Sequence, residues 1–163
     1  GVAQDYKEAV KWYTKAAEQG DARAQFNLGL MYNDGEGATQ DYKEAMKWYT
    51  KAAEQGYARA QFNLGSKYNN GEGATQDYKE AMKWYTKAAE QGYAGAQTNL
   101  GVMYYKGEGV VQDYKSAHMW FNIAAANGGS EAVKKRDILA KVMTPSQIEK
   151  AQDMAREWMA KHQ

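Results

Sequence analysis

A strict period of 36 residues runs through this chain and constrains its fold more than any other feature. Residues 21–56 and 57–92 differ at only four positions, and residues 93–128 form a more divergent third copy. A fixed period between about 20 and 50 residues is typical of solenoids, in which each unit stacks on its neighbours because it cannot bury its apolar face alone. The residues that recur at this spacing are Trp12, Trp48, Trp84 and Trp120, together with Asp5, Asp41, Asp77 and Asp113, and with Gly20, Gly56, Gly92 and Gly128.

Each unit carries the signals for two helices and for the turns between them. In the first full unit we expect helix A over residues 22–33, and helix B to begin after Asp41. The Asp41 carboxylate would cap free backbone N–H groups while Glu44 reaches back from the third helical position. Gly56 lies where a left-handed residue ends a helix. The chain is therefore predicted to be all-α, with seven helices in the repeats and two in the tail.

The apolar residues of both helices form stripes at helical spacing. A stripe of this kind, repeated in every unit, predicts the core, so the aromatic period is assigned to packing and not to a ligand cage. A glycine in helix A would let the neighbouring helix approach closely. The packed side of helix A contains Ala24, Gln25, Leu28, Gly29 and Tyr32, and that of helix B contains Ala45, Trp48, Tyr49 and Ala52.

Composition excludes several classes of function. The 21 Lys and Arg residues balance 20 Asp and Glu, so no bulk charge draws the chain to nucleic acid or to an anionic membrane. There is no cysteine, and His118 and His162 are the only histidines. A catalytic or metal site needs a convergent cluster of such groups, so we expect no enzyme activity, no metal and no cofactor. No apolar run approaches the roughly 18 residues of a membrane-spanning helix.

These residues also carry a family resemblance. Residues 22–56 read AxAQxNLGxxYxxGxGxxQDYxxAxxWYxxAAxxG, and the pattern recurs twice downstream. It resembles the Sel-one-like repeat, a relative of the tetratricopeptide repeat. The resemblance implies a right-handed α-solenoid of antiparallel helix pairs that acts as an adaptor for a protein or peptide partner. Many family members are bacterial, and a good number of them are exported to the periplasm or secreted.

The resemblance also divides the chain into units. Residues 1–20 resemble the second half of a truncated repeat, so the array is expected to continue upstream. Full repeats occupy 21–56, 57–92 and 93–128, and residues 129–163 resemble the capping helices of bacterial members.

Differences among the repeats indicate where a partner would bind. The positions of helix A that change between repeats all lie opposite its packed side on a helical wheel. In tetratricopeptide domains that side lines a concave groove, and asparagines there hold the ligand backbone. Asn27 and its equivalents would act in that way, unless they bond a neighbouring helix or only record a recent duplication of the repeat. The alternative for the variable positions is random sequence drift on a solvated surface. The predicted contacts are Arg23, Phe26, Asn27, Leu30, Arg59, Phe62, Asn63, Asn99 and Val102.

A row of lysines on helix B supports an alternative function. Lys43, Lys47 and Lys51 are spaced one helical turn apart, and the row recurs in other units. Such a row would bind a polyanion or an anionic surface, although Glu44 and Glu54 dilute it.

The last helix B departs from this row, which predicts where the tail lies. Met119 and Ile123 replace two lysines at positions that face water in earlier units. Exposure of these side chains would forgo roughly 1.5–3 kcal/mol each, so we expect a cover. The second tail helix, with Thr144, Pro145 and Gln147 as its start signal, carries the candidate stripe; a homodimer through the Met119 and Ile123 face is the alternative. The stripe consists of Ile148, Ala151, Ala155, Trp158 and Met159.

Overall fold

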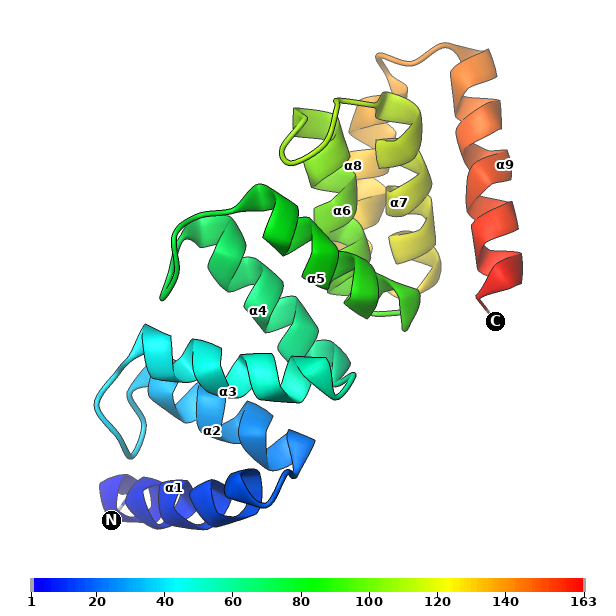
Figure 1. Cartoon of the computed structure of the whole chain (residues 1–163). Helices are drawn as coiled ribbons and strands as arrows, with labels where there is room; N and C mark the ends of the chain where they lie inside the picture. The colour runs from blue at the N-terminus through cyan, green and yellow to red at the C-terminus, as the bar shows by residue number, and fades with distance from the viewer. Residues whose placement is uncertain (1, 163) are drawn as a thin grey trace. The chain divides into compact units, whose positions relative to one another are not determined.

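The computed structural model describes residues 2–162, which form nine helices and no strand (Figure 1). This confirms the predicted all-α class. The chain comprises two compact units, one ending at Trp84 and one beginning at Tyr85, so that α5 contributes to both. The helices are α1 (Val2–Glu18), α2 (Ala22–Asp34), α3 (Tyr42–Glu54), α4 (Ala58–Asn70), α5 (Tyr78–Glu90), α6 (Ala94–Lys106), α7 (Tyr114–Ala126), α8 (Ser130–Ala140) and α9 (Pro145–Lys161).

In the first unit, α2 lies between α1 and α3, and α3 also packs against α4 (Figure 1). The predicted stripes meet in its core, where Leu28, Tyr49 and Leu64 are fully buried. Trp48 is only 6% exposed because it packs with Leu28 of the helix before it, whereas Trp12, in the first described helix, is 62% exposed. Position in the period therefore does not ensure burial by itself.

The helix ends follow the sequence signals with one exception. Asp41 caps α3, since its carboxylate accepts hydrogen bonds from the backbone N–H groups of Lys43 and Glu44. Glu44 does not complete the reciprocal capping box, because one of its carboxylate oxygens lies 3.8 Å from Lys47 Nζ and the other is buried without a partner. Gly56 has the predicted left-handed φ of 91°.

Close packing inside a repeat depends on a glycine in helix A. A Cβ atom at Gly29 would lie 2.7 Å from the ring of Tyr49 and 3.3 Å from the carbonyl oxygen of Ala45. Such distances are shorter than van der Waals contact, so only glycine lets α2 and α3 approach this closely. The close approach predicted for Gly29 is confirmed.

Buried glutamines join each helix A to the helix B before it. Gln25 Nε2 donates to the carbonyl oxygen of Ala17 at 3.1 Å, and Gln61 and Gln97 make the equivalent bonds within their own units. The acceptors belong to last turns of helices, where carbonyl groups lack partners along the helix. The repeat therefore keeps a buried amide at this position to connect successive helices.

In the second unit, α6 packs against α7, and α7 also contacts α8 and α9. Its core contains Phe121, Leu139 and Ala151, drawn from α7, α8 and α9 respectively. The start of α9 is a complete capping box, in which Thr144 accepts from the Gln147 backbone and the Gln147 side chain accepts from the Thr144 N–H. Both tail helices thus complete the second unit instead of extending beyond it.

Candidate protein-binding surface

The predicted contact residues on helix A differ widely in exposure. Arg23 and Arg59 are exposed, and Phe26 is only 2% exposed. A half-buried side chain at the edge of a core presents part of its surface to a partner. The half-buried members of the predicted set are Asn27, Leu30, Phe62, Asn63, Asn99 and Val102.

The prediction for Phe26 is wrong, because this ring is inside the first unit and not on an open surface. Tyr57 stacks on it with ring centroids 5.2 Å apart, and the Arg59 guanidinium lies 4.9 Å above it. Its other neighbour is Tyr49, at 5.9 Å. A helical wheel accounts only for the partner of α2 within its own repeat. In the structure, the start of the next helix A covers a further side of α2. Tyr57 and Arg59 therefore present the surface at this point.

Another variable position of helix A is also buried, against expectation, in all three full repeats. Met31, Lys67 and Met103 are 8%, 8% and 3% exposed. The ammonium group of Lys67 lies 4.2 Å above the ring of Tyr42 and 3.7 Å from a Glu72 carboxylate oxygen. A lysine is tolerated here because its charge has both an aromatic face and a carboxylate.

Asn63 has a structural partner in the first unit. Burial raises the pKa of the Tyr49 hydroxyl to about 12, against the opposing effect of a side-chain hydrogen bond from Asn63. Part of the amide's bonding capacity is thus used within the fold, and an amide has further donor and acceptor positions. At this one position, the bond to Tyr49 agrees with the alternative that Asn27 and its equivalents bond a neighbouring helix.

In the second unit, the helix A face contains a hollow of about 270 Å³, which we call the α6–α8 hollow. Val102, the predicted contact, lines it together with Phe121 and Leu139 from neighbouring helices. Ile138 is 64% exposed at this hollow. The period offers a signal for the contribution of α8, since Ile138 lies 36 residues after Val102, but the resemblance assigns residues 129–163 to a cap and not to the binding face.

Two lysines lie beside this apolar floor. Lys106 and Lys135 line the α6–α8 hollow, and Lys106 Nζ is 3.7 Å from a Glu108 carboxylate oxygen. Tyr105 also lines it and stacks on Tyr114, with ring centroids 5.5 Å apart. The arrangement suits an apolar side chain with a negative charge beside it.

The lysine row on helix B is exposed as predicted, but its charges have neighbours. Lys47 Nζ is 3.8 Å from Glu44 and 5.0 Å from the centre of the Trp48 ring. Lys83 repeats the arrangement with Glu80 at 3.3 Å and Trp84 at 5.0 Å. The glutamates reduce the field available to a polyanion.

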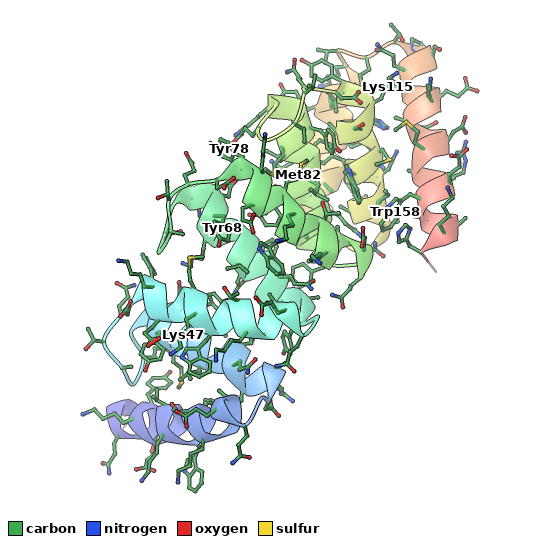
Figure 2. The ribbon with its side chains drawn as sticks, viewed as in Figure 1. Lys47, Tyr68, Tyr78, Met82, Lys115 and Trp158 are labelled. Atoms are coloured by element: carbon green, nitrogen blue, oxygen red, sulfur yellow. The ribbon has the colours of Figure 1, made fainter. Side chains whose placement is uncertain are left out.

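The tail covers the last helix B, as predicted. α9 packs along α7, where Ile123 is fully buried and Met119 is half-buried. Trp158 lies on the side of α9 that faces α7 (Figure 2), and its ring meets Trp120 edge-on with centroids 5.2 Å apart. Burial of Ile123 within the chain means that no second copy is needed to cover this face. In the same stripe, Ala151 and Ala155 are buried.

Two general properties bear on the kind of site expected. Within residues 2–162, no group of three or more His, Asp or Glu side chains is placed to hold a metal ion. No helix in the same range is both long and apolar enough to cross a membrane.

The model of the Sel1 repeat matches residues 1–21, 22–57, 58–93 and 94–129. The chain belongs to the Sel1 repeat family. Its fold is accordingly an all-α solenoid of repeated helix pairs. Sel1 repeat proteins are generally scaffolds for protein interactions, and their fold is not an enzymatic one. The family therefore implies protein partners.

Solved structures of bacterial Sel1 repeat proteins are similar to this chain. A protective antigen present in uropathogenic Escherichia coli strains, which displays an SLR fold, matches at 42% identity and a TM-score of 0.87, over 94% of this chain and 33% of its own. A Sel1 repeat protein from Oxalobacter formigenes matches at 34% identity and a TM-score of 0.80, over 95% of this chain and 64% of its own. Helicobacter pylori cysteine rich protein B matches at 28% identity and a TM-score of 0.65, over 82% and 96% of the two chains.

This Sel1 repeat chain spans one third of the first of these relatives and just under two thirds of the second. No curated protein sequence matches it.

Proposed function

We propose that this chain is a non-catalytic adaptor that binds a segment of a partner protein on the helix A face of its repeats. The observation that carries the proposal is the α6–α8 hollow, where apolar Val102, Phe121 and Leu139 lie beside two lysines on that face. Peptide-binding surfaces commonly combine a pocket for an apolar side chain with polar groups that orient the ligand.

The proposed ligand is an extended segment with an aliphatic or aromatic anchor and an acidic neighbour. The anchor would enter the α6–α8 hollow, and the acidic group would pair with Lys106 or Lys135. Phe26 is excluded from the contact set because it is buried, and Tyr57 replaces it. The other proposed contacts are Arg23, Asn27, Leu30, Arg59, Phe62, Asn63, Asn99 and Val102.

Binding of a polyanion through the helix B lysines is the alternative, and the apolar floor of the α6–α8 hollow favours the protein ligand over it. Lys47 and Lys83 each have a glutamate within 3.8 Å. A polyanion complex would weaken steeply with salt. A segment anchored by an apolar side chain would not.

The test is selection of peptides from a random library displayed on phage, followed by affinity measurements. Selected peptides should share an apolar anchor with an acidic neighbour, and Ile138→Glu should weaken their binding roughly tenfold or more, because it places a negative charge at the rim of the hollow, where the acidic group of the ligand would lie. Val142→Glu is the matched control, since Val142 is 66% exposed, compared with 64% for Ile138, and is not among the residues lining the hollow. Equal binding by the two variants would reject the α6–α8 hollow as the site.

A further inference from the structure

A second hollow lies at the other side of the tail, where α7, α8 and α9 meet. Its volume is about 600 Å³, within the range of ligand sites. Arg136 from α8 and Arg156 from α9 line it, and the rest of the lining includes Ala126, Val133 and Met159. We call it the arginine hollow. It shares no residue with the α6–α8 hollow, and its two cationic groups are guanidinium groups, whereas those of the α6–α8 hollow are ammonium groups.

The Arg136 side chain is held in position by polar groups of α7 and α8. Its Nη1 donates to Asn122 Oδ1 at 3.0 Å, and Asn122 Nδ2 lies 3.3 Å from Nδ1 of His118, which is only 2% exposed. Arg136 Nε donates to Asp137 at 3.2 Å. A guanidinium with two of its nitrogens fixed in this way keeps a further amino group to offer, with little rotamer entropy left to lose on binding.

The charges around the arginine hollow favour an anion. Arg156 pairs with Asp153 on the same helix, and Arg136 pairs with Asp137, but neither aspartate is among the lining residues. Both aspartates are more than half exposed, so solvent weakens their hold on the two guanidinium groups. No carboxylate belongs to the described lining, and the two arginines therefore lack an anion inside it.

Comparison with the other repeats shows which residues of this site are peculiar to the last helix B. Ala126 occupies the position held by a glutamate in every earlier helix B. A glutamate there would place its own carboxylate at the arginine hollow. His118 and Asn122 likewise replace the residue types of earlier units, and together they hold Arg136. The equivalent residues are Glu18, Glu54 and Glu90 for Ala126, Met46 and Met82 for His118, and Thr50 and Thr86 for Asn122.

We propose that the arginine hollow binds the C-terminal carboxylate of a partner polypeptide that ends in an aliphatic residue. A carboxylate accepts charge-assisted hydrogen bonds from guanidinium N–H groups, and both Arg136 and Arg156 line the hollow where they could donate them. In the last residue of a polypeptide the carboxylate and the aliphatic side chain are both bonded to Cα. Both groups therefore fit a small site with a charged rim and an apolar wall. The polypeptide source follows from the protein partners of the Sel1 family, and the site does not depend on the helix A face.

The probe is the N-acetylated tetrapeptide Gly-Gly-Ala-Val, as its free acid and as its C-terminal amide. Each would be titrated into the ¹⁵N-labelled full chain while the arginine Nε–H signals are followed by NMR. The free acid should bind at least tenfold more tightly than the amide, since a hydrogen bond to a charged group strengthens binding by about that factor. The Arg136 and Arg156 signals should move, whereas those of Arg23 and Arg59, which lie in the first unit, should stay.

Variants with matched controls locate the effect. Ala126→Glu should weaken binding of the free acid at least tenfold, while Ala160→Glu, which adds the same charge at an exposed position of α9 outside the lining, should not. Arg136→Gln should also weaken it, compared with Lys134→Gln on the same helix. The urea unfolding midpoint of each variant shows that it is folded.

Three results would overturn the proposal. One is equal affinity for the acid and the amide, and another is full binding by a folded Ala126→Glu variant. The third is binding of isovalerate, the corresponding free acid without a peptide chain, as tightly as the tetrapeptide, which would reject the chain terminus as the ligand. Ile138→Glu should leave the titration unchanged, so failure of this site and failure of the α6–α8 hollow are distinguishable.

Discussion

The buried glutamine of helix A is the residue through which stability of the array is best tested. Gln97 is fully buried, donates to the carbonyl oxygen of Ala89 at 2.9 Å and accepts from Asn127 Nδ2 at 3.0 Å. Gln97→Leu removes both bonds, and at roughly 0.5–1.5 kcal/mol for each the free energy of unfolding should fall by about 1–3 kcal/mol. Ala89 keeps the Gly92 N–H as a partner at 3.0 Å, which limits the loss.

Gln97→Glu is the sharper perturbation, because it changes a donor into an acceptor without altering shape. At neutral pH a buried carboxylate would then face the Ala89 carbonyl oxygen, and the loss should reach about 3 kcal/mol or more. Protonation in acid restores a donor, so the deficit relative to the wild type at the same pH should shrink as the pH falls. Urea unfolding followed by circular dichroism measures both effects.

Gln112 provides the control for this experiment. It donates to the carbonyl oxygen of Tyr105 at 2.8 Å but is exposed, so water replaces the lost bond in Gln112→Glu. That change should cost less than about 0.5 kcal/mol. Two results would contradict the argument that the buried glutamines stabilise the fold. One is unfolding of the Gln97→Glu and Gln112→Glu variants at the same urea concentration, and the other is a loss of stability in Gln97→Glu that stays the same in acid.

Three further perturbations test other parts of the fold. Burial lowers the pKa of His118 from its usual value of 6.5; the charge of Arg136 adds to this effect and that of Asp137 opposes it. As the pH falls, the unfolded chain therefore binds the proton first, so the free energy of unfolding should be greatest above about pH 6.5 and fall below it. His118→Met should flatten this slope in urea unfolding at several pH values, and an unchanged slope would contradict the assignment. Gly29→Ala should lower the free energy of unfolding by about 1–3 kcal/mol despite the better helix propensity of alanine, because the new Cβ meets the Tyr49 ring; a stabilised variant would show that the helices separate freely. Trp158→Ala should lower the free energy of unfolding by roughly 2 kcal/mol in thermal or urea unfolding, because it removes contacts with α7. Trp12→Ala is the control, since Trp12 is 62% exposed, and an equal loss in both variants would refute the stabilising role of α9 packing.

Sequence reasoning named one residue of the α6–α8 hollow, Val102, and placed the buried Phe26 on the surface. It identified Val102 and the half-buried asparagines correctly as residues at a surface, and it predicted the cover over Ile123. It failed at Phe26, since a helical wheel describes one helix and the partner implied by its apolar stripe. In a solenoid the start of the next repeat is an additional neighbour, and its contribution depends on the distance between units.

The sequence alone determined the repeat, the helix boundaries, the caps and the core stripes, because each follows from the local geometry of a helix and from a period of 36 residues. Only the tertiary structure decided which variable positions remain open and where α8 and α9 leave space against α7. The two hollows are formed by residues far apart along the chain, such as Asn122 and Arg156, and their separation in space depends on how whole helices pack. Periodicity specifies the direction of a side chain around its own helix, but it carries no information on the distance to the next helix.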